Sequence, residues 1–364
     1  MSGVRPLVLC ELAVTDLRNL ARTTLRPSPR VTVISGPNGH GKTSLLEAAY
    51  LAATSRSFRT SKLGELPRHG CERGEVTATF TRDGLSCVQE VVIEGGRRAV
   101  RAEGKRPRSL AAFATRSPVV CFHAGELELS QGAAAGRRTL LDRVALFFDP
   151  VSADDRERYE DAMRQRKRAL DERGPTAREL DAFEALAATH GARLTVARRR
   201  TAQALAEVTR RWFERIAPRG LALGAEYAPG GVDDAARFAT ELSLRRGRDH
   251  ARGSAGFGPH RDDVALSLDG HPARAVASQG QHRALTIALK LGELDLVAEA
   301  AAALPVFLLD DVSSELDQAR TAALFEVLAE RQGQLLITTT RPELIDTARF
   351  SDRLDLSVRD GALG

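Results

Sequence analysis

Apolar and polar positions follow two different periods along the chain. Residues 75–80 and 87–96 alternate between apolar and polar side chains, as the strands of a β-hairpin do. Residues 31–34, 307–311 and 334–340 are mostly apolar runs, and the last two end in polar residues, which is typical of strands buried in a parallel sheet. Strands of one fold are therefore predicted near both ends of the chain, and the sequence between them is predicted to be an insertion.

The inserted middle is charged, and its pattern is helical. Apolar side chains recur at three- and four-residue steps in residues 159–170 and 183–212, which predicts two antiparallel helices joined by a turn at residues 173–176. If they pack as a short coiled coil, the second helix is about 50 Å long unless Gly191 breaks it. An ordinary helical bundle is the alternative, and both predict an arm attached to the fold built from the chain ends.

Composition narrows the class of protein. The 364 residues are 43% hydrophobic, enough for two or three lobes of ordinary size. A net charge of +5 permits a nucleic acid partner without requiring one. Four cysteines lie far apart without a C-x-x-C pair, which suggests neither a zinc site nor a disulfide framework. No apolar run approaches the roughly 18 residues of a membrane span, so a cytoplasmic protein without a membrane partner is expected.

A phosphate-binding loop of the pattern G-x-x-x-x-G-K-[ST] follows the strand predicted at residues 31–34 and precedes a helical segment at residues 43–53. Backbone N–H groups at such a helix start bind phosphates. Lys42 is expected to reach the outer phosphates of ATP, and the Thr43 hydroxyl to bind Mg²⁺. The predicted ATP-binding residues are Gly36, Pro37, Asn38, Gly39, His40, Gly41, Lys42, Thr43 and Ser44.

Two acids end the strand predicted at residues 307–311. Beside a complete phosphate loop they indicate a nucleotide-hydrolysing site. Asp310 is expected to hold Mg²⁺, and Asp311 is placed to orient or deprotonate the attacking water.

A second helix start is predicted at residues 278–281, SQGQ. Ser278 as an N-cap leaves a hydroxyl and backbone N–H groups at the positive end of a helix, which makes a second phosphate site or, alternatively, a plain helix cap. With SELD at residues 314–317 after the acids, the motifs resemble the ATP-binding-cassette class, whose signature closes the ATP site of a second copy. The resemblance implies an ATP-dependent homodimer in which Lys42 and Asp311 act with Ser278 in trans. Its signature is Ser278, Gln279, Gly280 and Gln281, and its D-loop is Ser314, Glu315 and Asp317.

The sequence resembles one family more closely than it resembles the ATP-binding-cassette class as a whole. Six stretches in order resemble the RecF family of bacterial ATPases, at residues 46–59, 136–142, 258–263, 278–283, 308–317 and 337–340. The fold that this implies is α/β, an ABC-type ATPase head with mixed β-sheets, a P-loop and a signature-helix lobe. An inserted helical arm makes it similar to SMC and Rad50 heads without the long coiled coil. The expected ranges are 1–135 and 255–364 for the two parts of the head and 136–254 for the arm.

The resemblance also implies a function. RecF-like proteins are ATPases with weak, DNA-stimulated turnover that dimerise with ATP and Mg²⁺ on DNA at single-strand/double-strand gap junctions. Their family partners are RecR and RecO, and their task is to help load RecA in replication, recombinational repair and the SOS response.

Several positions depart from the family pattern. Ser44 follows the P-loop threonine where Asn is usual, and His123-Ala124, with Glu126 nearby, stand in the region of the Q-loop, so the residue with that role is left open. Thr339 or Thr340 is expected at the switch position that is His in transporters. Asp311 stands where transporters have Glu. A shorter carboxylate and a hydroxyl both favour slow hydrolysis.

Basic residues give candidate DNA contacts. Arg56 and Arg59 lie beyond the P-loop helix, where SMC-type heads carry an arginine loop, and Arg101 and Lys105 belong to a basic group at residues 97–108. For the clusters at residues 164–168 and 198–200 of the arm, a solvated helix face is the expectation.

Two rival functions use the same motifs. A transporter ATPase subunit needs far fewer residues between Lys42 and Ser278 than this chain has. An SMC- or Rad50-like DNA tether needs hundreds of heptad residues, many more than this arm provides.

Overall fold

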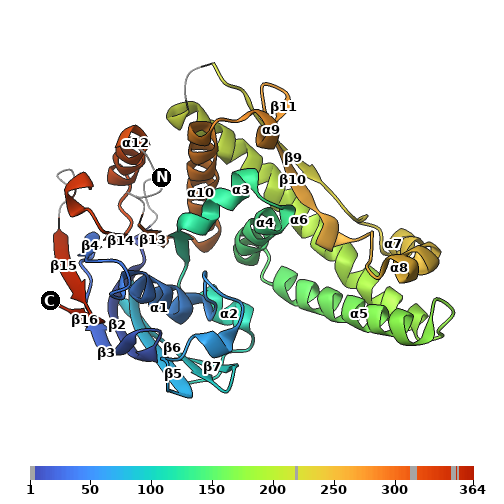
Figure 1. The fold of residues 1–364 in the computed structure, drawn as a ribbon, viewed down its shortest axis with the longest axis horizontal. Helices are drawn as coiled ribbons and strands as arrows, with labels where there is room; N and C mark the ends of the chain where they lie inside the picture. The colour runs from blue at the N-terminus through green and yellow to red at the C-terminus, as the bar shows by residue number, and fades with distance from the viewer. Residues whose placement is uncertain (1–4, 218–219, 312–317, 346–349, 351) are drawn as a thin grey trace. The chain divides into compact units, whose positions relative to one another are not determined.

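The computed structural model describes residues 5–217, 220–311, 318–345, 350 and 352–364 (Figure 1). The chain divides into two compact units. Unit 1 comprises Met1–Glu126 and Glu293–Gly364, and unit 2 comprises Leu127–Gly292. Unit 1 is thus assembled from both ends of the chain. The expected ranges were 1–135 and 255–364 for the head and 136–254 for the arm, and they stay a prediction. They place Ser278 in the head, whereas Ser278 lies in unit 2.

The larger sheet of unit 1 has the strand order β16-β15-β4-β14-β13-β8. Neighbours are parallel from β15 to β8, so the carboxyl ends of these strands share one edge. The parallel strands expected at residues 307–311 and 334–340 are therefore confirmed as β13 and β14. The six strands are β16 (Ala362–Leu363), β15 (Arg353–Arg359), β4 (Val31–Ser35), β14 (Leu335–Thr339), β13 (Val306–Asp310) and β8 (Val119–Phe122).

A second sheet of unit 1 is antiparallel, in the order β3-β2-β5-β6-β7. The hairpin expected from alternation at residues 75–96 is confirmed as β5 and β6. The buried side chains of β5 alternate with partly exposed ones because one face of this sheet packs on the core. The strands are β3 (Leu20–Leu25), β2 (Val8–Leu17), β5 (Arg73–Arg82), β6 (Leu85–Glu94) and β7 (Arg97–Ala102).

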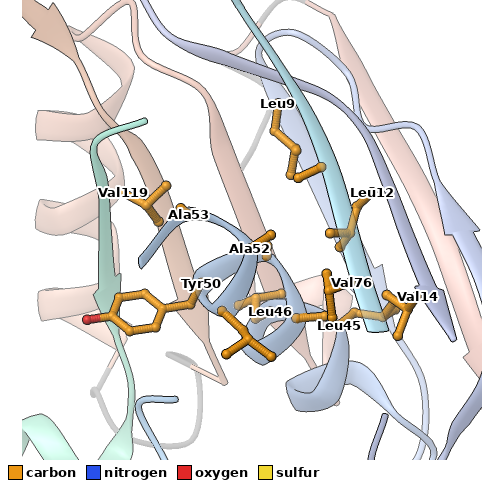
Figure 2. Close-up of a cluster of buried hydrophobic side chains, with 14 of the residues drawn as sticks. Leu9, Leu12, Val14, Leu45, Leu46, Tyr50, Ala52, Ala53, Val76 and Val119 are labelled. Carbon is orange, nitrogen blue, oxygen red and sulfur yellow. The ribbon is translucent and has the colours of Figure 1, made fainter. Parts of the chain in front are cut away.

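Helix α1 (Lys42–Thr54) packs against strands of both sheets. Figure 2 shows its Leu45, Leu46 and Tyr50 among side chains from β2, β5 and β8, including Leu9 and Val119. Nearly every residue of α1 is buried. A helix held on all sides keeps the loop before it in a fixed position. The other elements of unit 1 are β1 (Arg5–Pro6), β12 (Ala303–Leu304), α2 (Leu110–Ala114), α12 (Gln318–Ala329), and the 3-10 turns Leu63–Glu65 and Pro342–Leu344.

Unit 2 is mainly helical. The two helices expected in the arm are α5 (Val151–Arg173) and α6 (Leu180–Ile216), which pack against each other (Figure 1). Across the described ranges, none of the helices has the length and apolar content needed to cross a bilayer. Besides α10, described below, unit 2 also contains α3 (Glu128–Gln131), α4 (Ala134–Phe148), α7 (Ala235–Leu244), α8 (Arg246–Arg252), α9 (Ala273–Val276), β9 (Leu223–Ala228), β10 (Asp263–Leu268), β11 (His271–Pro272) and the 3-10 turn Pro259–Arg261.

Gly191 does not break α6. The helix runs through it for 37 residues, about 55 Å in length. A Cβ atom at Gly191 would lie 2.8 Å from Cζ of Phe238 and 3.0 Å from Cδ2 of Tyr159. The glycine therefore makes room for two aromatic rings to pack against α6, and this packing favours the helix at a residue of low helix propensity.

Helix α10 (Gln279–Ala301) begins in unit 2, and its last turns belong to unit 1. It follows the short α9, and the start of α10 is the segment expected to be the signature. Unlike α1, this helix starts at an exposed serine.

Candidate nucleotide site

The loop between β4 and α1 has the strand, loop and helix context that a phosphate-binding loop requires. Three of its glycines have positive φ, +151° at Gly36, +83° at Gly39 and +113° at Gly41. A Cβ atom at Gly36 would lie 2.3 Å from the carbonyl oxygen of Val358. Gly41 is the N-cap of α1, and its position is not filled by a side-chain acceptor among the described residues. The backbone N–H groups at this helix start are therefore open to an anion.

The Lys42 side chain lies inside the loop and is 5% exposed. Its ammonium group donates hydrogen bonds to the carbonyl oxygens of Gly36 (2.6 Å) and Pro37 (2.9 Å). Burial lowers the pKa of Lys42, while the carboxylates of Asp311 and Asp310 act in the opposite direction. A charge held by neutral carbonyl groups is well placed to be neutralised by a phosphate.

The Walker A hydroxyl and the Walker B carboxylate meet at the edge of the sheet. Thr43 donates a hydrogen bond of 2.9 Å from its hydroxyl to Oδ1 of Asp310. The hydroxyl of Thr338 donates to the same oxygen at 2.7 Å. This convergence follows from the strand order, because β14, which carries Thr338, lies between β4 and β13. Burial raises the pKa of Asp310, although the two hydroxyl groups oppose that rise.

Thr338 also positions the second acid. The backbone N–H of Asp311 donates to two oxygens of Thr338, the hydroxyl at 3.0 Å and the backbone carbonyl at 3.1 Å. Asp311 has a φ of +49°, in the left-handed region, so the strand turns sharply where it ends. The switch residue was expected at Thr339 or Thr340, and that assignment stays a prediction, but Thr338 is the threonine that contacts both acids. The pairing of Asp310 with Thr338 across β13 and β14 distinguishes it.

A cavity of about 740 Å³ lies beside the loop, and the residues that line it belong to unit 1. Asn38, Gly39, Gly41, Lys42, Thr43, Ser44 and Asp311 of the predicted set contribute to it. The lining continues to Arg18, Arg59 and residues 67–71. The cavity combines phosphate-binding backbone with cationic side chains, which suits a charged nucleotide.

Residues remote in sequence hold the outside of the loop. The side chain of Asn19 donates to the carbonyl oxygen of Gly39 at 2.9 Å and accepts from the hydroxyl of Ser44 at 2.8 Å. On the other side, the backbone N–H of Gly361 donates to the carbonyl oxygen of His40 at 3.0 Å, and that of Asp360 donates to its Nδ1 at 3.0 Å. Sequence reasoning missed Asn19, Asp360 and Gly361. Ser44, which stands where the family usually has Asn, donates the hydrogen bond that orients Asn19.

Glu47 connects α1 to the loop that carries the candidate DNA residues. Its buried carboxylate accepts two hydrogen bonds of 2.9 Å from Arg18 and one of 3.3 Å from Arg59. Arg59 is therefore partly engaged, with its side chain 44% exposed. Arg56 is exposed in the same loop, Arg101 is exposed on β7, and Lys105 is exposed just after that strand.

The basic clusters of the arm are largely neutralised. Lys167 and Arg168 pair with the acids four residues later, at 2.7 and 2.8 Å. Arg166 and Arg198 are buried, so the expected solvated face is wrong for these two residues. Each forms ion pairs with two acids: Arg166 with Glu184 and Asp249, and Arg198 with Asp142 and Asp262.

The start of α10 is a closed helix cap. The hydroxyl of Ser278 accepts from the backbone N–H of Gln281 at 3.3 Å, and the Gln281 side chain accepts from the backbone N–H of Ser278 at 2.7 Å. This reciprocal pair is a capping box, and it confirms Ser278 as an N-cap. Gln279 and Gly280 form the first turn. His282 and Thr286, one and two turns into the helix, both contact the hydroxyl of Ser130 at 3.2 Å.

Two further predicted segments are the D-loop and the Q-loop. Ser314, Glu315 and Asp317 of the expected D-loop lie outside the described residues. In the region of the Q-loop, His123 follows β8 and lies 3.5 Å from the buried carboxylate of Glu126. The His123 ring also stacks on Phe58, with centroids 4.9 Å apart.

Comparison with known proteins gives the family. Residues 8–358 match the family model described as RecF/RecN/SMC N terminal domain. A curated relative from Anaeromyxobacter sp. (strain Fw109-5), named DNA replication and repair protein RecF, is 39% identical over 362 residues, covering 97% of this chain and 98% of the relative. This chain belongs to the RecF family. The RecF of Myxococcus xanthus (strain DK1622) is 37% identical over 365 residues, covering 97% of this chain and 96% of that relative.

Solved structures agree with this assignment. A RecF–ATP structure superposes with a TM-score of 0.87 at 27% identity, covering 100% of this chain and 98% of that one. The Smc head domain from Pyrococcus furiosus, at 15% identity and a TM-score of 0.55, covers 98% of this chain and 95% of that one and shares the fold. The expected ABC- and SMC-type ATPase fold with an inserted arm is therefore confirmed.

Proposed function

We propose that this RecF-family chain is an ATP-dependent DNA-binding protein of recombinational repair and replication. In this proposal ATP and Mg²⁺ dimerise two copies on gapped DNA, and slow hydrolysis resets them. The observation that carries it is the contact between Thr43 and Asp310 at the end of a complete P-loop, with Lys42 held inside that loop. Relatives named as DNA replication and repair proteins and a relative solved with ATP support the same assignment.

The residues at the sheet edge fit Mg²⁺. Hard oxygen donors are what this ion prefers, and the Thr43 hydroxyl and the Asp310 carboxylate lie 2.9 Å apart. Thr43 and Asp310 would hold the ion together with the nucleotide phosphates, and Mg²⁺ would neutralise charge on those phosphates. Thr338 keeps Asp310 oriented whether or not Thr43 turns to the ion.

Asp311 is the residue that would act on the attacking water. Its backbone is held by Thr338, and its side chain lines the cavity beside Lys42. We expect hydrolysis to be slow, because aspartate reaches one methylene less far than the glutamate that transporters use. DNA is expected to raise the rate by favouring the dimer.

The second half of each site is proposed to come from the partner copy. Ser278 and the first turn of α10 offer a hydroxyl and a positive helix end to the phosphates bound by the P-loop of the other subunit. ATP then links two copies, because it binds the dimer more tightly than the monomer. This ATP-dependent dimerisation is tested by measuring the size of the purified protein with ATP, with ADP and without nucleotide. A dimer is expected only in the sample with ATP.

A mixing experiment separates action in trans from action in cis. Lys42→Ala and Ser278→Arg are each expected to inactivate hydrolysis when tested alone. In a mixed dimer, one site combines the intact Lys42 of one copy with the intact Ser278 of the other, so an equimolar mixture recovers about a quarter of the normal rate. If the mixture stays inactive while both variants still fold and form mixed dimers, each chain completes its own site and the proposal is wrong.

DNA contacts are proposed on unit 1, at β7 and in the loop after α1. Arg101 and Lys105 are exposed at β7, whereas Lys167 and Arg168 of α5 are paired with acids of the same helix. Such contacts to phosphates are independent of sequence and weaken with salt. Arg101→Ala with Lys105→Ala is expected to lower affinity for gapped DNA several-fold, and Lys167→Ala with Arg168→Ala is the matched control on the arm.

Family resemblance extends the proposal to partners. RecR and RecO are the proposed protein partners in the cytoplasm, and the proposed outcome is the loading of RecA on gapped DNA. Reconstitution of RecA loading with purified RecO and RecR, with and without this protein, tests that extension separately from ATP binding.

A further inference from the structure

Helix α3, near the beginning of unit 2, is a single turn of four residues that lies beside α4 and α10 (Figure 1). It also contacts α9, the short helix that precedes the signature. One isolated turn is unstable, because the hydrogen bonds that it forms do not offset the cost of fixing its backbone. Its place in the fold must therefore come from bonds to other elements, and α4 and α10 each supply a set.

The first set of bonds comes from Arg137 of α4, whose side chain is 12% exposed. Its Nη1 donates to the carbonyl oxygens of Leu129 and Gly132, both at 3.1 Å, at the end of α3. Its Nε and Nη2 donate to the two carboxylate oxygens of Asp263, the first residue of β10, at 2.6 and 2.9 Å. A fork of this kind fixes the orientation of the guanidinium group, so α3 is held to β10 through Arg137.

Arg137 and Asp263 give two sequence motifs a shared structural task. Arg137 belongs to the stretch at residues 136–142 and Asp263 to the stretch at residues 258–263, two of the six stretches that resemble the RecF family. The nucleotide cavity of unit 1 is lined by other residues. The two motifs therefore act on the backbone of α3 and not on the phosphates held by the P-loop.

The second set of bonds joins α3 to α10 at Ser130, which is 2% exposed. The Ser130 hydroxyl lies 3.2 Å from Nδ1 of His282, 3.2 Å from the hydroxyl of Thr286 and 3.1 Å from the carbonyl oxygen of Leu127. One hydroxyl has a single proton to donate, and a carbonyl can only accept. All three contacts are satisfied when this proton goes to the carbonyl and the two residues of α10 donate to Ser130.

These contacts fix the first two turns of α10. His282 and Thr286 follow Ser278 by four and eight residues, so they lie on the same side of the helix as the signature serine. Two hydrogen bonds to one buried hydroxyl, one turn apart, oppose rotation of α10 about its axis. A continuous path thus runs from β10 through α4 and α3 to the start of α10. We call the three residues along this path the signature brace: Asp263, Arg137 and Ser130.

We propose that the signature brace positions Ser278 for the nucleotide of the partner copy, so that Arg137 and Ser130 are positioning residues for ATP-dependent dimerisation and hydrolysis. This inference rests on the proposed action of Ser278 in trans. The brace lies in unit 2 and the P-loop in unit 1, so a single chain is expected to bind ATP without the brace. An error of about 1 Å in a group that acts on the phosphates lowers the rate steeply. Loss of the brace is therefore expected to reduce dimerisation and kcat rather than the first binding of ATP.

The experiment compares variants of the full chain. Ser130→Ala removes the hydroxyl that both residues of α10 contact. Arg137→Lys keeps the positive charge but loses the fork that bonds α3 and Asp263 together. Each variant is expected to weaken the ATP-dependent dimer and to lower kcat at saturating ATP about tenfold, while affinity for a fluorescent ATP analogue at low protein concentration changes less than about twofold. Sedimentation, phosphate release and fluorescence anisotropy measure the three quantities.

Thr286→Val and Thr195→Val form a matched pair, because each removes a buried hydroxyl from a helix of unit 2. Thr286 donates to Ser130, whereas Thr195 donates to the carbonyl oxygen of Gly191 within α6. The first variant is expected to weaken the dimer, and the second to dimerise as the parent does. His282→Asn, whose amide can donate from near the position of Nδ1, is expected to retain more of the dimer than His282→Leu.

A double variant tests whether the brace is one path. If Arg137 and Ser130 both act through α3, Arg137→Lys adds little to the loss that Ser130→Ala already causes. Losses that multiply in the double variant would mean that the two residues act independently, and would overturn the brace as a unit.

The outcomes separate the brace from a merely structural role and from the proposed function. A structural role predicts that ATP affinity falls in proportion to the dimer. That result, or parent-like dimerisation and kcat in both Ser130→Ala and Arg137→Lys, overturns the proposal. Ser278→Arg is measured alongside. If it abolishes the dimer while the brace variants do not affect it, only this inference fails. If Ser278→Arg also leaves the dimer intact, the proposed function fails and this inference fails with it.

Discussion

Two helix starts of this chain are candidates for holding the same triphosphate, and they are built in opposite ways. At the start of α1 the N-cap is Gly41, and none of the described side chains caps the helix, so its N–H groups are open. At the start of α10 Ser278 and Gln281 satisfy each other. The first site is prepared for an anion in the monomer. The second has used the backbone N–H groups of Ser278 and Gln281 in its capping box, and it keeps the Ser278 hydroxyl proton to donate to a phosphate.

The largest expected effect is on ATP binding at the start of α1. Lys42→Ala removes the ammonium group held inside the loop. We expect ATP affinity to fall about 100-fold, the loss of one strong charge-assisted interaction. Titration with a fluorescent ATP analogue measures it. Lys62→Ala, an exposed lysine on the same unit, is the control, and a Lys42 variant with unchanged affinity would remove the P-loop from the argument.

The next effect distinguishes the two roles of Ser278. If the serine is only a helix cap, Ser278→Ala and Gln281→Ala break the same capping box and should both cost about 1 kcal/mol of stability. If its hydroxyl binds the partner's nucleotide, Ser278→Ala abolishes the ATP-dependent dimer. Gln281→Ala keeps that dimer, because it removes only the acceptor of the Ser278 backbone N–H and leaves the Ser278 hydroxyl in place. Equal loss of dimer in both variants would favour the plain cap.

A smaller effect tests how firmly the open site is supported. Gly36→Ala places a Cβ atom 2.3 Å from the carbonyl oxygen of Val358, whereas a Cβ at Gly39 meets nothing within 4 Å. Both glycines have positive φ, so both alanine variants carry backbone strain, and only Gly36→Ala adds a clash. We expect Gly36→Ala to weaken ATP about tenfold more than Gly39→Ala does, with an added stability loss of about 1–3 kcal/mol. Thermal melting and nucleotide titration report the two quantities.

The smallest effect concerns pH. Burial raises the pKa of Asp310, so the folded state binds a proton there more readily than the unfolded state does. The free energy of unfolding therefore falls as pH rises from the ordinary aspartate pKa of 3.8 through the raised pKa of Asp310 in the folded state. Asp310→Asn removes that loss, and its Oδ1 can still accept from Thr43 and Thr338. We expect a slightly higher melting temperature for the variant at neutral pH, and no difference at the acid end.

The control for this pH prediction is Glu94→Gln, an exposed acid of unit 1. Its melting temperature is expected to follow that of the parent at every pH. A lower melting temperature of Asp310→Asn at neutral pH would contradict the expected direction, and would mean that the carboxylate stabilises the fold.

The sequence was sufficient for the parts of the site that local chemistry determines. The P-loop, the acids at the end of β13 and the N-cap at Ser278 follow from spacing and residue type, and so do the hairpin of β5 and β6 and the two arm helices. These features depend on neighbours in the chain, whose geometry is nearly fixed by the peptide backbone.

What the sequence did not provide depends on pairing between remote segments. Thr338 meets Asp310 only because β14 lies beside β13, and Asn19 meets Gly39 only after the two sheets pack around α1. Gly191 looked like a helix breaker because the aromatic rings of Tyr159 and Phe238 that require it come from other helices. The burial of Arg166 and Arg198 was missed for the same reason, since their acidic partners lie elsewhere in the chain.

The turn at Asp360 and Gly361 joins β15 to β16 and donates hydrogen bonds to His40 of the P-loop. A Cβ atom at Gly361 would lie 2.7 Å from the carbonyl oxygen of Asn19, the residue that bonds to Gly39 of the loop. One glycine, more than 300 residues along the chain from the phosphate-binding segment, thus adjoins the supports on both flanks of that segment. Inherited changes at Gly361 could impair nucleotide binding while every motif residue stays intact.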